Sequence, residues 1–142
     1  MAEKHRILLV DDEPSIVKMV SKRLEVEGFE VLIAMDGREG LVRAQAENPD
    51  LIILDLMLPK LNGYEVCAML KQDTRYQRIP IVLFTAKAQD KDEQLGMECG
   101  ANAYVRKPFR AQELLEKVRS LIVAAPPSSG PGLAPTNQEA PS

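Results

Sequence analysis

Residues 51–55 read Leu-Ile-Ile-Leu-Asp, and this stretch decides the fold. Its four aliphatic residues have no polar position among them, and the run is too short for a buried helix. An uninterrupted apolar strand is covered on both faces, which is typical of a parallel sheet with helices packed on each side. The strand ends at a carboxylate, Asp55, so a charged side chain is expected at the edge of an apolar core.

The same kind of strand recurs along the chain and alternates with helical patterns. Residues 7–10 form a second wholly apolar run, and apolar residues at helical spacing follow from Pro14 until Gly28. We expect further strands over residues 31–34, 81–84 and 103–105, and further helices over residues 37–46, after Gly63, over 89–99 and around 114–122. The helix over 89–99 rests on the alternation alone, because its apolar residues follow no clean helical stripe.

This order of elements predicts one α/β domain. Five strands alternating with five helices favour a doubly wound parallel sheet with helices on both faces. Residues 1–124 are of ordinary domain size. Residues 125–142 contain five of the ten prolines and a single charged residue, so they cannot bury a core. We expect them to be a flexible tail or a linker to a further domain.

The composition narrows the class of protein. The net charge is −3 and the sequence pI is near 5.3, which provides no basic field and argues against direct nucleic-acid binding. No apolar run approaches 18 residues and no signal peptide begins the sequence, so we expect a cytoplasmic protein without a membrane segment. Cys67 and Cys99 lack the spacing of a zinc site, and we expect them to be reduced.

Reactive side chains follow four of the five expected strands. They are Asp11-Asp12-Glu13 after the first, Asp55 at the third, Thr85 at the fourth and Arg106-Lys107-Pro108 at the fifth. Only the second strand, followed by Met35-Asp36-Gly37, has no evident reactive group. Ligands of parallel α/β sheets bind at the carboxyl ends of the strands, so we expect these side chains to meet at one edge.

The residue types at this edge predict phosphoryl chemistry. Asp11, Asp12 and Asp55 would repel one another unless a cation joined them, and hard oxygen ligands suit Mg²⁺. A carboxylate beside Mg²⁺ can act as a nucleophile toward phosphorus. Thr85 and Lys107 supply the hydroxyl and the cation that a transferring phosphoryl group needs. Alone, each residue has a plainer explanation as a helix cap, a turn former or a solvated charge.

The chain resembles the receiver domain of two-component response regulators over residues 6–123. The motifs that carry the resemblance are Ile-Leu-Leu-Val-Asp-Asp-Glu-Pro, Leu-Ile-Ile-Leu-Asp-Leu-Met-Leu-Pro-Lys-Leu-Asn-Gly-Tyr-Glu-Val, Leu-Phe-Thr-Ala and Gly-Ala-Asn-Ala-Tyr-Val-Arg-Lys-Pro-Phe. Four such motifs in the correct order, each at an expected strand end, form a specific constellation. The resemblance implies a sheet in the order 2-1-3-4-5 flanked by five helices.

The resemblance also implies roles for individual residues. Asp55 would accept the phosphoryl group. Asp12, Asp55 and the backbone carbonyl of Met57 would ligate Mg²⁺, with Asp11 acting mainly through a metal-bound water. Thr85 and Lys107 would hold the phosphoryl oxygens, Thr85 and Tyr104 would form the switch, and the Lys107–Pro108 peptide bond would be cis.

The expected function is a phosphorylation-dependent switch of protein–protein binding. A sensor histidine kinase or phosphotransfer protein would phosphorylate Asp55, and the face of the fourth helix, fifth strand and fifth helix would bind a downstream protein. The protein would be a monomer or weak dimer, and it would catalyse only its own phosphoryl uptake and hydrolysis. Met57 and Lys87 occupy positions that would influence the lifetime of phosphorylated Asp55.

Two other functions share this chemistry or this architecture. A small phosphatase with an aspartyl-phosphate intermediate would need a substrate pocket and a cap, and the short connections after strands one and three leave little chain for them. A flavin or nucleotide carrier would need a phosphate-binding loop, and the sequence has neither GxGxxG nor GxxxxGK followed by Ser or Thr. Turnover of a phosphate ester, or a flavin absorbance, would favour these alternatives.

Overall fold

The structure is a computed structural model that describes residues 4–56, 58, 60–85, 100–106 and 110–122. Its five strands are β1 (Arg6–Val10), β2 (Glu30–Ala34), β3 (Leu51–Asp55), β4 (Ile81–Thr85) and β5 (Ala103–Arg106). The helices in the described ranges are α1 (Pro14–Val26), α2 (Gly37–Glu47), α3 (Gly63–Lys71) and α5 (Ala111–Ile122). The helix expected over 89–99 and the tail expected over 125–142 lie outside these ranges.

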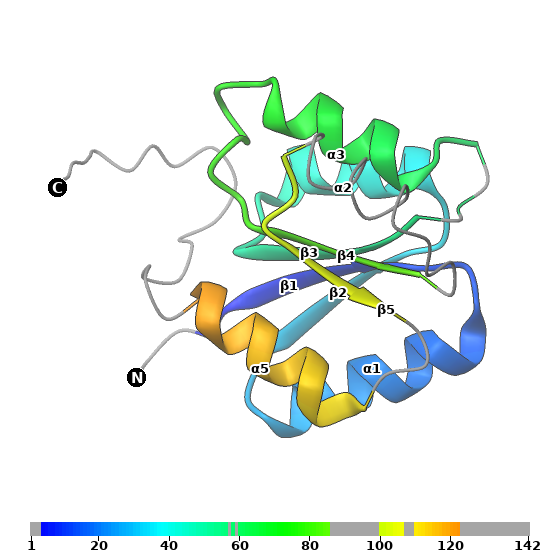
Figure 1. The fold of residues 1–142 in the computed structure, drawn as a ribbon, viewed down its shortest axis with the longest axis vertical. Coiled ribbons are helices and arrows are strands. Elements are labelled where there is room, and N and C mark those ends of the chain that lie inside the picture. The colour runs from blue at the N-terminus through cyan, green and yellow to red at the C-terminus, as the bar shows by residue number, and fades with distance from the viewer. Residues whose placement is uncertain (1–3, 57, 59, 86–99, 107–109, 123–142) are drawn as a thin grey trace, which may run out of the picture.

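The strands form one parallel sheet in the order β2-β1-β3-β4-β5, which confirms the predicted fold. Figure 1 shows α2 and α3 on one face of the sheet and α1 and α5 on the other. The register brings Val10 beside Leu54, Asp55 beside Phe84 and Thr85 beside Arg106. The carboxyl ends of β1, β3 and β4 therefore meet at one edge of the sheet.

Two apolar clusters, one on each face of the sheet, form the core. Ile7 and Leu9 of β1 belong to the cluster under α1 and α5, while Leu8 and Val10 belong to the cluster under α2 and α3. This alternation follows from the two-residue period of a strand. All four side chains are fully buried, and burying an aliphatic side chain contributes about 1.5–3 kcal/mol.

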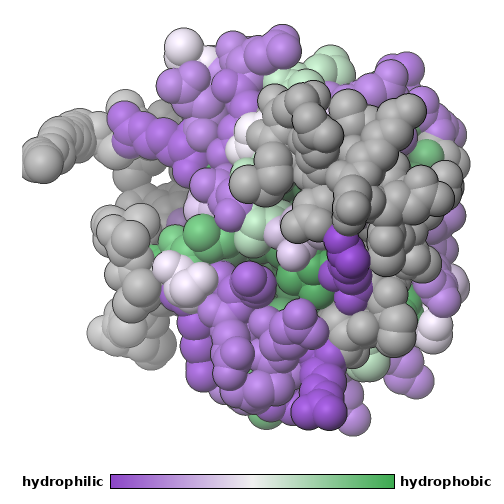
Figure 2. Space-filling view, in the orientation of Figure 1, coloured by the Kyte–Doolittle hydropathy of each residue, from purple (hydrophilic) through white to green (hydrophobic). Residues whose placement is uncertain are grey.

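The sheet is less completely covered at its β2 edge. Glu30 and Ile33 are exposed, whereas every residue of the central strand β3 is buried. Seen in the orientation of Figure 1, hydrophilic residues cover the two helical layers, and hydrophobic residues appear in a band between them (Figure 2). Because β2 lies at the edge of the sheet, its first residue, Glu30, can be exposed to solvent.

Residues typical of helix N-termini stand at the start of α1, α2 and α3. Pro14 occupies the first turn of α1, where its missing N–H costs no hydrogen bond. Asp36 caps α2 by accepting a hydrogen bond from the N–H of Glu39 at 2.8 Å. Asn62 and Glu65 form a reciprocal capping box at the start of α3.

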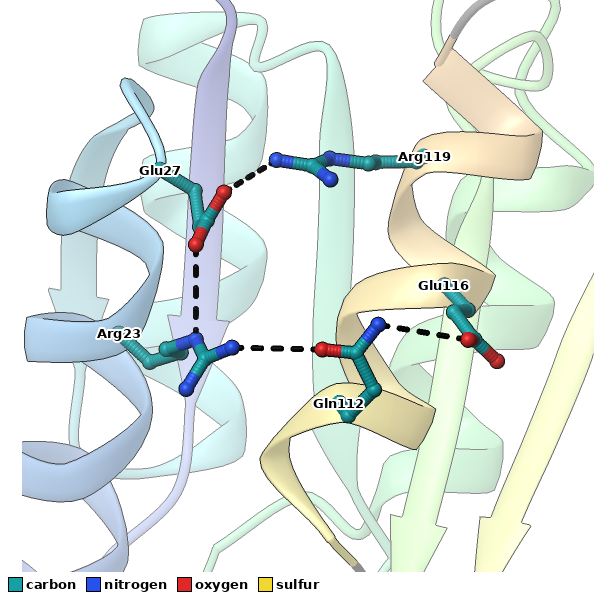
Figure 3. A network of polar contacts seen from close by, with 5 residues as sticks. All are labelled: Arg23, Glu27, Gln112, Glu116 and Arg119. Carbon is teal, nitrogen blue, oxygen red and sulfur yellow. Dashed lines mark hydrogen bonds and ion pairs between the residues drawn. The ribbon is translucent and has the colours of Figure 1, made fainter.

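A polar network joins α1 to α5 on one face of the sheet (Figure 3). The carboxylate of Glu27 forms ion pairs with Arg23 of α1 and Arg119 of α5. Arg23 also donates a hydrogen bond to Gln112 of α5 at 3.3 Å, and Gln112 donates one to Glu116 at 3.4 Å. Glu27 therefore connects the C-terminal end of α1 to the last turns of α5.

Candidate functional site

Three carboxylates converge at the carboxyl edge of the sheet. Ligand oxygens of Asp11, Asp12 and Asp55 all lie within 4.8 Å of one another. Asp11 is 0% exposed and Asp55 is 5% exposed, and they are buried acids in an otherwise apolar part of the core, whereas Asp12 is exposed. The structure thus brings together the three acidic residues that the sequence predicts to meet.

The turn between β1 and α1 orients Asp11. Its backbone N–H donates to the carbonyl oxygen of Ala34 at 3.1 Å, which continues the β1–β2 pairing by one residue. Its carboxylate accepts a hydrogen bond from the N–H of Glu13 at 2.8 Å. These two bonds hold the chain as it leaves the sheet, so Asp12 follows on the solvent side and α1 begins at Pro14.

Asp55 is held by the chain that follows it. The N–H of Leu56 donates to the carbonyl oxygen of Phe84 at 3.2 Å, and the N–H of Gly63 donates to the carbonyl oxygen of Leu56 at 3.1 Å. Gly63 packs so closely that an ideal Cβ there would lie 2.5 Å from the carbonyl oxygen of Asp55. The strand end and the start of α3 are therefore in direct backbone contact.

The donor set of this edge fits a hard divalent cation. Carboxylate oxygens are the ligands that Mg²⁺ prefers, and it usually keeps several waters in addition to one or two carboxylates. Two buried carboxylates and one exposed carboxylate at these separations repel one another, and a cation between them would remove that repulsion. The exposed Asp12 leaves one side of the cluster open to solvent.

Of the other predicted site residues, the structure describes Thr85 and Tyr104 but not the rest. Thr85 ends β4 beside Arg106, which places its backbone one strand away from Asp55. Tyr104 lies in β5, is partly buried and packs against the apolar cluster under α2 and α3. Met57, Lys87 and the Lys107–Pro108 peptide lie outside the described residues, so their roles and the cis geometry remain predictions.

One group near the site was not selected from the sequence. The Asp36 carboxylate, which caps α2, forms an ion pair with Lys60 of the β3–α3 loop, with 3.6 Å between Oδ2 and Nζ. The hydrogen bond from the Glu39 N–H, together with the nearby Lys60 cation, lowers the pKa of Asp36 below its ordinary value. The Asp-Gly pair at residues 36–37 is a helix-start signal that would have indicated the cap but not the ion pair.

The sequence matches a known family over most of its length. The family model described as the response regulator receiver domain matches residues 7–119, which include all four strand ends of the site. The chain belongs to the response regulator receiver domain family. Receiver domains are phosphorylation-dependent signalling modules, and this one brings the carboxylates of Asp11, Asp12 and Asp55 together.

Two curated relatives of the receiver domain are bacterial regulators. It is 46% identical over 127 residues to the alkaline phosphatase synthesis transcriptional regulatory protein PhoP of Bacillus subtilis, covering 87% of this chain and 52% of PhoP. It is 44% identical over 119 residues to the DNA-binding response regulator MtrA of Mycolicibacterium smegmatis, covering 84% of this chain and 51% of MtrA. The chain spans about half the length of these relatives.

Solved structures agree with this assignment. The Vibrio cholerae chemotaxis protein CheY4 superimposes with a TM-score of 0.78 at 34% identity, covering 84% of this chain and 99% of that one. A response regulator from Chloroflexus aurantiacus superimposes with a TM-score of 0.82 at 34% identity, covering 85% and 99%. Within the described residues, no helix of the receiver domain is long and apolar enough to cross a membrane.

Proposed function

We propose that this receiver domain switches protein binding by accepting a phosphoryl group on Asp55. The observation that carries the proposal is the convergence of the Asp11, Asp12 and Asp55 carboxylates within 4.8 Å. Asp55 is the best nucleophile of the three because it ends the buried central strand and its backbone is held on both sides by β4 and α3. The membership in the receiver family supports the same assignment.

Asp12, Asp55 and the backbone carbonyl of Met57 would hold Mg²⁺, and Asp11 would contact it through water. The metal would neutralise charge on the transferring group and orient it toward Asp55. The burial of Asp11 and its hydrogen bond from the Glu13 N–H support an indirect role, because one of its oxygens is already engaged. The exposed side of the cluster at Asp12 supports access for a phosphoryl donor.

The proposed reaction moves a phosphoryl group from a phosphohistidine of a sensor kinase or phosphotransfer protein to Asp55. An Asp55 carboxylate oxygen forms the new O–P bond while the N–P bond of the donor breaks. The imidazole nitrogen keeps the bonding electron pair. Hydrolysis reverses the modification, because water attacks the phosphorus, inorganic phosphate leaves and the carboxylate is regenerated.

Thr85 and Lys107 would bind the phosphoryl oxygens, and Thr85 and Tyr104 would transmit the change. The strand pairing supports this arrangement, since β3, β4 and β5 are consecutive in the sheet. Tyr104 packs against an apolar cluster, so a new rotamer would repack the surface beside β5. We propose that a downstream protein binds the face built from residues 89–99, β5 and α5.

The chain's net charge supports protein rather than nucleic-acid contacts for residues 1–124. PhoP and MtrA are named as transcriptional and DNA-binding regulators, and those names describe longer proteins of which this chain covers about half. We propose that this domain acts in the cytoplasm as a monomer or weak dimer without touching DNA itself. Its catalysis would be limited to its own phosphoryl uptake and release.

Intact-mass measurement tests the proposal directly. The protein is incubated with Mg²⁺ and acetyl phosphate or phosphoramidate, and we expect a gain of about 80 Da, the mass of one phosphoryl group. Asp55→Asn and excess EDTA should each abolish the gain. Asp73→Asn, which removes a partly exposed carboxylate from the α3–β4 loop, is the matched control and should retain it. A wild type that stays unmodified beside a phosphorylated control receiver contradicts the proposal.

A further inference from the structure

The β3–α3 loop that follows Asp55 is pressed against the start of α2. An ideal Cβ on Gly37 would lie 1.8 Å from the carbonyl oxygen of Leu61 and 2.6 Å from its carbonyl carbon. No side chain larger than hydrogen fits at position 37 while Leu61 keeps this place. Gly37 is itself buried, and Leu61 packs against the apolar cluster under α2 and α3.

An ion pair lies next to this contact. The Nζ atom of Lys60 is 3.6 Å from Oδ2 of Asp36, the residue before Gly37. The Asp36 side chain is 19% exposed and that of Lys60 is 64% exposed. Asp36 is also fixed by its capping hydrogen bond from the Glu39 N–H, so its carboxylate is a rigid partner for the flexible lysine. Lys60 has φ +72°, a region that non-glycine residues seldom adopt.

The base of the same loop is closed beside Asp55. The hydrogen bond from the Gly63 N–H to the Leu56 carbonyl oxygen joins the two ends of the loop. The loop is therefore held at its base by Leu56 and Gly63 and at its far side by Asp36 and Gly37. A shift of Lys60 or Leu61 on the far side would move the adjacent Asn62 and Gly63, and Gly63 contacts Leu56 beside Asp55.

We infer that Asp36 and Lys60 are positioning residues, which hold the β3–α3 loop in the arrangement that the acidic site needs for binding Mg²⁺. The inference rests on the proposed function of that site. Both residues would act through the loop and not on the reacting atoms. Their ion pair and the Gly37–Leu61 contact set where the loop lies, and the loop sets the position of the chain directly after Asp55.

Two single variants separate positioning from a simple effect of charge. Asp36→Asn keeps a good helix cap and removes the negative charge, whereas Lys60→Gln removes the positive charge and leaves a non-glycine residue at the same φ. If only the electrostatic field at the acidic site mattered, Asp36→Asn would weaken Mg²⁺ binding and Lys60→Gln would strengthen it. If positioning matters, both variants weaken it.

The measurement is Mg²⁺ affinity by calorimetric titration of the unphosphorylated protein. Because an exposed ion pair is worth at most about 1 kcal/mol, we expect each single variant to bind Mg²⁺ about two- to fivefold more weakly. The double variant should be no weaker than the worse single variant, and Lys60→Arg should restore the wild-type affinity. Lys22→Gln, which removes an exposed cation from α1, should leave it unchanged.

The outcomes are distinct. Opposite shifts that cancel in the double variant, or no shift in either single variant, overturn the positioning role. Urea unfolding of each variant shows whether a lower affinity merely reflects loss of fold. A parallel intact-mass assay reports Asp55 phosphorylation. If the wild type binds Mg²⁺ but accepts no phosphoryl group, the proposed function fails while the affinities still decide the role of Asp36 and Lys60.

Discussion

Gly63 lies against the backbone of Asp55, and no side chain would fit between the start of α3 and the end of β3. An ideal Cβ on Gly63 would be 2.5 Å from the Asp55 carbonyl oxygen and 2.8 Å from the Cα of Leu56. Real Cβ atoms do not approach backbone atoms this closely, and neither of these backbone atoms can move away as a flexible side chain would. A side chain at position 63 would therefore clash with the backbone of the candidate nucleophile unless α3 or the end of β3 shifted.

Gly63→Ala should destabilise the protein and slow phosphoryl uptake by Asp55. Alanine gains up to about 1 kcal/mol in helix propensity, but overpacking costs about 1–3 kcal/mol, so we expect the clash to dominate. Urea unfolding measures the stability, and intact mass against time measures the uptake. Equal stability and equal rate in both proteins would show that the backbone accommodates the methyl group without moving Asp55.

Gly28→Ala is the matched control for this substitution. Gly28 has φ +97° and nothing within 4 Å of an ideal Cβ, so alanine there introduces backbone strain without a clash. The strain should cost about 1–2 kcal/mol. Because Gly28 lies in the turn before β2, at the other edge of the sheet, the folded variant should take up phosphoryl groups at the wild-type rate.

Asp12→Asn should have opposite effects on stability without and with Mg²⁺. Without a cation, removing one of three neighbouring carboxylates relieves repulsion of roughly 1 kcal/mol, so the free energy of unfolding should rise. Wild type should gain about 2.7 kcal/mol when free Mg²⁺ reaches a hundred times its Kd, and the variant should lose most of this gain. Thermal unfolding in EDTA and across a Mg²⁺ series measures both effects.

A control variant distinguishes the effect of the acidic cluster on stability from the effect of the net charge. Glu25→Gln neutralises an exposed carboxylate of α1 and should change neither the stability in EDTA nor the response to Mg²⁺. If Asp12→Asn and Glu25→Gln behave alike, the acidic cluster is not a cation site.

The sequence predicts the central strands closely and the contacts between loops poorly. Four adjacent aliphatic residues at 51–54 cannot form a half-exposed strand, so β3 is placed to within one residue. The edge strand β2 begins one residue earlier than predicted, at the exposed Glu30. The N–H of Glu30 donates a hydrogen bond to the carbonyl oxygen of His5, so hydrogen bonding and not burial determines where the strand begins. The alternation rule therefore identifies the strands better than it places their ends.

The acidic cluster was predictable for the same reason, since Asp11 and Asp12 follow one apolar strand and Asp55 ends another. The contact of Gly37 with Leu61 was not, because it joins residues 24 positions apart and depends on how two loops approach. Neither residue carries a chemical signal that would pair them. Lys60 likewise reads as an ordinary solvated lysine until the fold brings it beside Asp36.

Glu27 and Arg119 should be energetically coupled, because their ion pair joins α1 to α5 (Figure 3). Glu27→Gln, Arg119→Gln and the double variant form a cycle whose coupling energy should be about 0.2–1 kcal/mol and should fall in 1 M salt. Urea unfolding at both salt concentrations measures it. A parallel cycle with Lys117→Gln, which is exposed on the same helix, should give no coupling. Equal coupling energies in the two cycles would mean that net charge and not the contact is responsible.

The charge of Asp36 should make part of the protein's stability depend on pH. The pKa of Asp36 is lowered from its ordinary value of 3.8, first by the hydrogen bond from the Glu39 N–H and then by the Lys60 cation. The folded protein therefore binds fewer protons at this group than the unfolded chain does. The resulting stability is fully present above the unfolded pKa and is lost as the pH falls through the folded pKa.

Asp36→Asn should reveal this dependence as a difference between two unfolding curves. The free energy of unfolding of wild type minus that of the variant should be constant near neutral pH, begin to fall below about pH 4 and level off below the folded pKa. Urea unfolding between pH 2 and 7, roughly the range in which carboxylates titrate, measures it. In a Lys60→Gln background the fall in this difference should persist over a narrower pH range, because the backbone hydrogen bond lowers the pKa of Asp36 more than the Lys60 cation does. A difference that stays constant through the acid range would mean that the capping bond does not favour the ionised form.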